Sequence, residues 1–86
     1  MLRMPPDVYD QMVAHCLACL PEEGCGLLAA PPGTPDVAVC YPTRNVEASA
    51  RLYTVDPLHH LKADQDAEAR GLEIVGVFHS HTHTEA

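Results

Sequence analysis

Two histidines separated by one residue stand at the end of an apolar segment near the end of the sequence. The segment runs from Glu73 to His79, and His81 follows two positions later. In a β-strand, side chains two residues apart point to the same face, so the two imidazoles can bind one metal ion. Zinc prefers such nitrogen ligands, and a catalytic zinc takes three protein ligands and a water molecule. His79 and His81 are therefore candidate zinc ligands.

A carboxylate in an earlier segment could supply acid–base chemistry. Residues 21–26 read Pro-Glu-Glu-Gly-Cys-Gly and join an expected helix to a short apolar strand. A carboxylate at such a junction is partly shielded from water, which suits a general base. Glu22 and Glu23 are also compatible with ordinary solvated loop residues, and composition alone favours that simpler interpretation.

Helices and strands must together position these residues. A stripe that contains Val8, Met12 and Cys16 predicts the first helix, and Asp56-Pro57 is a typical helix start. The expected elements, in chain order, are a helix over residues 6–19, strands over 25–30, 36–41 and 51–55, a helix from 57 to near 71, and a strand over 73–79. The second strand should pair antiparallel with the first, and the last strand, apolar nearly throughout, should be central and covered on both faces. The order predicts an α/β fold, a mixed sheet flanked by helices.

Composition and charge exclude several classes of function. The 86 residues carry a formal net charge of −7 with five Lys and Arg, which argues against nucleic acid as a partner. No apolar run approaches the ~18–20 residues of a membrane span, so no membrane role is expected. The N-terminus lacks the pattern of a signal peptide. We therefore expect a cytoplasmic protein whose four cysteines remain thiols.

The cysteines offer an alternative metal site that the pattern does not favour. Cys16 and Cys19, with Cys25 and Cys40, could hold a structural zinc. The first two lie on the apolar stripe of the expected helix, however, and buried cysteines usually behave as small hydrophobic side chains.

Four further polar residues have no predicted role in chemistry. His15 lies off the apolar stripe and is expected to be solvated. His59 and His60 are expected to be exposed on the second helix, and Asn45 to lie in a loop after the second strand.

Taken together, two segments carry a resemblance to a known family. The pattern Glu-x-Cys-Gly-Leu-Leu over residues 23–28 and His-Ser-His-Thr-x-Thr-Glu-Ala over 79–86 resembles the JAMM (JAB/MPN-plus) zinc metallopeptidases. The similarity covers essentially the whole sequence and points to the small prokaryotic branch that acts on ubiquitin-like sulfur-carrier proteins. It implies that Glu23 is the catalytic glutamate, that His79 and His81 bind zinc, and that Ser80 is structural.

The family pattern continues beyond the last residue of this sequence. Its Ser and Asp would fall at the eighth and eleventh positions after His81, past Ala86. We therefore expect residues 1–86 to be the N-terminal part of a single JAB/MPN domain, a cytidine-deaminase-like sandwich that is incomplete at its C-terminus. Alone, these residues should be inactive or weakly active. His83 or Glu85 could otherwise approach the open coordination position.

The resemblance implies metal-assisted hydrolysis of an amide bond after the glycine-ending tail of a ubiquitin-like or sulfur-carrier protein, with Glu23 as the base. The alternative is a non-catalytic MPN-type module that only binds proteins; retention of Glu23 and the histidine pair favours the enzyme. A zinc deaminase would require His-x-Glu and Pro-Cys-x-x-Cys, which the sequence lacks.

Overall fold

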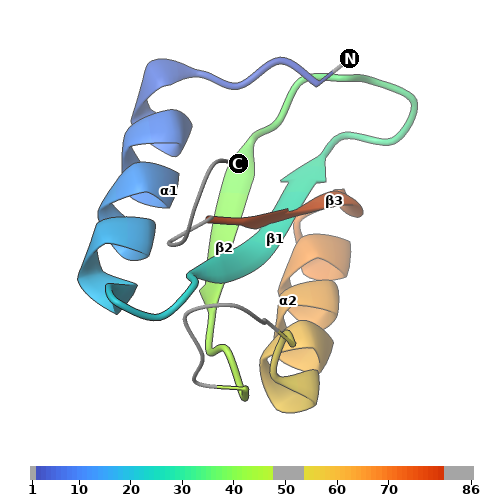
Figure 1. Cartoon of the computed structure of the whole chain (residues 1–86). Helices are drawn as coiled ribbons and strands as arrows, with labels where there is room; N and C mark the ends of the chain where they lie inside the picture. The colour runs from blue at the N-terminus through green and yellow to red at the C-terminus, as the bar shows by residue number, and fades with distance from the viewer. Residues whose placement is uncertain (1, 48–53, 81–86) are drawn as a thin grey trace.

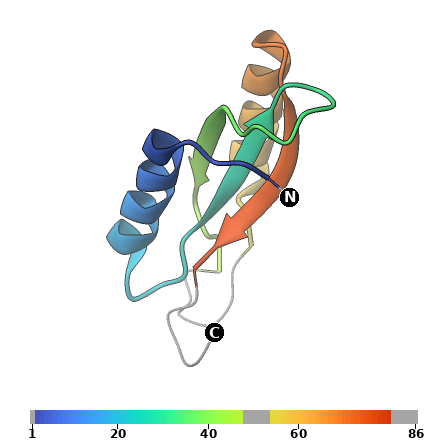
Figure 2. The ribbon, with the colours of Figure 1, turned by 90° about the horizontal axis from the view of Figure 1, so that it is seen from above.

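Two helices cover opposite faces of a three-stranded sheet in the computed structural model, which describes residues 2–47 and 54–80 (Figures 1 and 2). In chain order the elements are α1 (Pro6–Cys19), β1 (Cys25–Ala30), β2 (Val39–Thr43), α2 (Pro57–Ala69) and β3 (Glu73–His79). The predicted α/β fold class is confirmed, and the described strands all pair antiparallel. Neither described helix is long and apolar enough to cross a membrane.

Helix α1 begins and ends where the sequence predicts. Pro6 occupies its first turn, where the missing N–H is not needed, and the peptide bond Leu20–Pro21 after the helix is cis. Val8, Met12 and Cys16 face a core formed with β-strand side chains, including Leu28 and Phe78. The predicted apolar stripe therefore attaches α1 to one face of the sheet.

The central strand of the described sheet is β1, and the prediction that residues 73–79 form it is wrong. The strand order is β2-β1-β3, and all six residues of β1 are buried. In β3 only Phe78 is buried, and Val77 is exposed. An apolar run indicates that a strand is buried but not which neighbours it pairs with, and here the small side chains of β1 take the middle position.

The second strand starts and ends later than predicted. Residue 36 forms an isolated parallel bridge with Arg3 near the N-terminus, while β2 continues through Pro42 to Thr43. Proline cannot donate to a ladder and is tolerated at a sheet edge, which is where β2 lies. Of the third predicted strand, residues 51–53 lie outside the described residues, and Val55 forms an isolated antiparallel bridge with Asn45.

Helix α2 has the predicted start and packs on the sheet through two alanines. The Asp56 carboxylate accepts hydrogen bonds from the backbone N–H groups of Leu58 and His59, as an N-cap residue does. The buried residues of α2 are Ala63 and Ala67, whereas Leu58 and Leu61 are exposed. Alanines allow the helix backbone to approach the sheet closely, and this approach decides the packed face.

Candidate active site

Glu23 and His79 come together at one end of the β1–β3 pair. The carboxylate Oε1 of Glu23 lies 3.6 Å from Nδ1 of His79. Glu23 is only 6% exposed, and Nδ1 of His79 is buried, although the whole His79 side chain is 31% exposed. The accessible part of the imidazole is therefore on its other atoms. A shielded carboxylate beside a half-exposed imidazole can take up and release protons next to a bound substrate.

A reciprocal pair of hydrogen bonds fixes this end of the strands. The backbone N–H of Gly24 donates to the Ser80 hydroxyl (2.8 Å), and the backbone N–H of Ser80 donates to the Gly24 carbonyl (2.9 Å). These bonds continue the ladder beyond the pair Cys25 and His79. The structural role expected for Ser80 is confirmed, because the residue holds Glu23 in register with His79.

Asn45, which the sequence placed in a loop without a role, is buried and holds the backbone of Glu23. Its Nδ2 donates to the Glu23 carbonyl (3.0 Å). Its Oδ1 accepts from the backbone N–H groups of Glu47 (3.0 Å) and Thr54 (2.9 Å). One amide thus connects the backbone of the candidate base to two residues between β2 and α2, Glu47 and Thr54.

Replacing Asn45 by Asp is expected to lower the free energy of unfolding by about 1–3 kcal/mol, because the Glu23 carbonyl loses its donor and faces a carboxylate oxygen. Urea unfolding monitored by circular dichroism measures the change. The control is Glu47→Gln, an exposed change at the same loop that should alter stability by less than about 0.5 kcal/mol. Equal stability of the Asp variant and the unchanged protein would contradict the role given to Asn45.

His15 is not solvated as predicted but joins α1 to the sheet beside the site. Its Nε2 lies 3.0 Å from the Cys25 carbonyl and 3.1 Å from the Thr43 carbonyl, so one N–H donates to both. Its ring meets Phe78 edge-on, with ring centroids 6.3 Å apart. The spacing of residues 8, 12, 15 and 19 follows one helix face and could have predicted this contact.

Three of the described thiols are poor nucleophiles. Burial is the main cause that raises the pKa of Cys19, Cys25 and Cys40. A thiol must lose its proton to attack a carbonyl, so a raised pKa disfavours a nucleophilic role. The cysteines of the described residues are all free thiols.

An apolar groove of about 490 Å³ lies between α1 and β3 and reaches the candidate site. Its lining includes Met12 and Leu17 from the helix and Phe78 and His79 from the strand. Uncharged parts of a peptide could lie in this groove, with the polar groups of the site at its end.

The His79 imidazole fits zinc in chemical type, because an imidazole nitrogen is a common zinc ligand. Within residues 2–47 and 54–80, however, no group of three His, Cys, Asp or Glu side chains could hold a metal ion. The predicted second ligand, His81, and the two residues considered as substitutes, His83 and Glu85, lie outside the described residues. Their roles stay predictions.

Comparison with known proteins shows the family of this chain. Residues 5–86 match the model described as prokaryotic homologs of the JAB domain. The chain belongs to this family. The match includes both Glu23 and His79, which the fold brings into contact from positions far apart in the sequence.

Relatives of this JAB chain are named as peptidases. The CysO-cysteine peptidase of Mycobacterium tuberculosis is 38% identical over 80 residues, which cover 93% of this chain and 55% of the relative. The probable TtuB-protein conjugate cleaving protease of Thermus thermophilus is 37% identical, with coverage of 93% and 53%. The Desampylase of Haloferax volcanii is 29% identical, with coverage of 98% and 64%. The chain therefore spans between about half and two thirds of the length of these relatives.

A solved structure agrees with the fold of this JAB chain. The solution structure of a protein from Desulfitobacterium hafniense superimposes with a TM-score of 0.90 at 34% sequence identity. The superposition covers 100% of this chain and 60% of the other protein.

Proposed function

We propose that the protein is a zinc-dependent peptidase or isopeptidase that cleaves an amide bond at the C-terminal tail of a ubiquitin-like or sulfur-carrier protein. The observation that carries the proposal is the buried Glu23 carboxylate, 3.6 Å from the His79 imidazole in a JAB-family chain. The names of the relatives support the substrate class, since they refer to CysO–cysteine and TtuB–protein conjugates.

In this proposal His79 and His81 hold zinc, and Glu23 is the general base. The chemistry that zinc supplies when bound is Lewis-acid activation of a water molecule and of the scissile carbonyl. Glu23 accepts a proton from the attacking water and transfers it to the leaving amine. The hydrogen bonds from Asn45 and between Gly24 and Ser80 hold the backbone that carries the Glu23 side chain, so little ordering of this segment is needed during the reaction.

The proposal predicts that hydrolysis by the full-length protein, with every residue that its gene encodes, depends on a divalent metal. The substrate is a ubiquitin-like protein joined through its terminal glycine to a peptide, and mass spectrometry measures the released fragments. Treatment with a chelator should abolish cleavage, and zinc should restore it. Cleavage that survives full removal of the metal would refute the proposed mechanism.

A further inference from the structure

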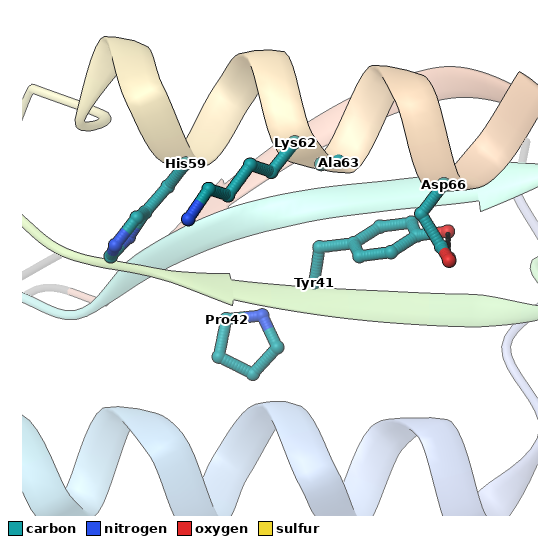
Figure 3. Close-up of a pocket in the computed structure, with 6 residues that line it drawn as sticks. All are labelled: Tyr41, Pro42, His59, Lys62, Ala63 and Asp66. Atoms are coloured by element: carbon teal, nitrogen blue, oxygen red, sulfur yellow. Dashed lines mark hydrogen bonds between the residues drawn. The ribbon is translucent and has the colours of Figure 1, made fainter.

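A second pocket lies on the α2 side of the sheet, beside the outer strand β2. Its volume is about 240 Å³, and six side chains line it: Tyr41, Pro42, His59, Lys62, Ala63 and Asp66 (Figure 3). The helix residues recur at spacings of three and four, so they share the face of α2 that looks toward β2. Figure 3 shows His59 and Lys62 together at one end and Tyr41 with Asp66 at the other.

The carboxylate at the acidic end of this pocket already has hydrogen-bond partners. Oδ2 of Asp66 accepts a hydrogen bond from the Tyr41 hydroxyl (2.5 Å) and contacts Nε of Arg70 (2.7 Å). The Tyr41 hydrogen bond is the main cause that lowers the pKa of Asp66, and burial is the main cause that raises the pKa of Tyr41 to about 12. The carboxylate charge is therefore compensated by Arg70, and the tyrosine keeps its proton.

The other end presents hydrogen-bond donors. Nδ1 of His59 accepts the backbone N–H of Arg44 (2.9 Å), so the proton of the neutral ring is on Nε2, which can donate. Lys62, the only lysine of the sequence, adds an ammonium group. Within the described part of α2, the ion pairs are His60–Asp64 and Asp66–Arg70, and neither involves Lys62.

A carboxylate is the ligand that matches these groups. One cation and one neutral hydrogen-bond donor can bind a carboxylate, which carries a single negative charge. Pro42 and Ala63 provide an apolar surface for the methylene groups of the side chain that bears the carboxylate. The chain as a whole carries a net charge of −7, so the attraction for a carboxylate comes only from the groups of this pocket.

The pocket lies close enough to the candidate site for one partner to reach both. Tyr41 lies in β2, which ends at Thr43, and Asn45 just beyond the strand donates to the backbone carbonyl of Glu23. Four residues of extended chain span roughly 13 Å, which is less than the width of a small protein domain. We propose that this pocket binds the carboxylate of an acidic side chain on the protein whose conjugate is cleaved at Glu23 and His79; this inference rests on the proposed function.

The first test compares steady-state kinetics of the full-length protein and its Lys62→Gln variant on a ubiquitin-like conjugate. We expect KM to rise by about 2–5-fold with little change in kcat, since an exposed charge contact is weak. Lys62→Arg should restore most of the affinity. The control is Arg3→Gln, which removes an exposed positive charge away from the pocket and should leave KM unchanged. An unchanged KM for Lys62→Gln would overturn the proposal.

The second test does not require activity. N-acetyl-glutamic acid α-amide is titrated into the full-length protein while NMR follows the Arg44 amide and the His59 ring. Saturable shifts that disappear in Lys62→Gln and persist in Arg3→Gln would support the pocket even if no hydrolysis were found. Absence of saturable shifts would overturn it. Tighter binding of free succinate than of the side-chain probe would refute the assignment to a protein side chain.

Discussion

Replacing Glu23 by Gln in the full-length protein is expected to lower kcat by about 10²–10⁴-fold. Glutamine has nearly the same shape but cannot accept a proton from water and return it to the leaving amine. The Glu23 side chain is buried beside His79, where the substitution keeps the shape of the site. Hydrolysis of a ubiquitin-like conjugate under single-turnover conditions measures the effect on chemistry.

The adjacent Glu22 provides a matched control for this experiment. Glu22 is exposed, whereas Glu23 is buried, so Glu22→Gln removes the same charge outside the site. It should retain nearly full activity. Circular dichroism should show that both variants are folded. Equal activity of Glu23→Gln and the unchanged protein would contradict the role of Glu23 as the base.

Replacing Gly26 by Ala is expected to destabilise the sheet by overpacking it. A Cβ at this position would overlap Cε2 and Cζ of the Phe78 ring and would lie 2.6 Å from the Tyr41 backbone oxygen. Because Gly26 is in the central strand, one neighbour is backbone and cannot rotate away. Overpacking of this kind costs about 1–3 kcal/mol, and each kcal/mol lowers Tm by roughly 4–8 °C in a domain of this size.

A second glycine in the same sheet serves as the control. At Gly76 in β3, an added Cβ would meet only flexible leucine side chains, the nearest being Cδ1 of Leu2 at 3.4 Å. Gly76→Ala should therefore change stability by less than about 0.5 kcal/mol. Calorimetry measures the Tm of both variants. Equal Tm values for Gly26→Ala and Gly76→Ala would contradict the packing of Gly26 against Phe78 and Tyr41.

The parts of the fold that local sequence determines were predicted well. Helix α1, strand β1, the start of α2 and strand β3 follow from apolar spacing and from the cap at Asp56-Pro57. The order of the strands and the position of β2 were not predicted, because both depend on pairing between distant segments. Likewise, the packed face of α2 is set by how closely Ala63 and Ala67 approach the sheet, not by its leucines.

The site was predicted only in part. The spacing of two histidines at the end of a strand selected His79, whereas Glu23 was selected through a family resemblance. No spacing rule predicts that residues so far apart meet. His15 and Asn45 were missed because their partners are backbone carbonyls of other segments: Cys25 and Thr43 for His15, and Glu23 for Asn45. Polar side chains that bind the backbone of a distant segment leave no local signal in the sequence. His15 is the exception, because its place on a helix face is such a signal.

The measurement that tests the central claim most directly is a zinc titration of the full-length protein and two variants by calorimetry. If His79 is a ligand and Glu23 is the base, the unchanged protein and Glu23→Gln should each bind one equivalent of zinc. His79→Ala should bind at least about tenfold more weakly, since even outer-shell changes weaken metal sites by 10–100-fold. Equal zinc affinity of His79→Ala and the unchanged protein would contradict the assignment of a zinc hydrolase site to this pair.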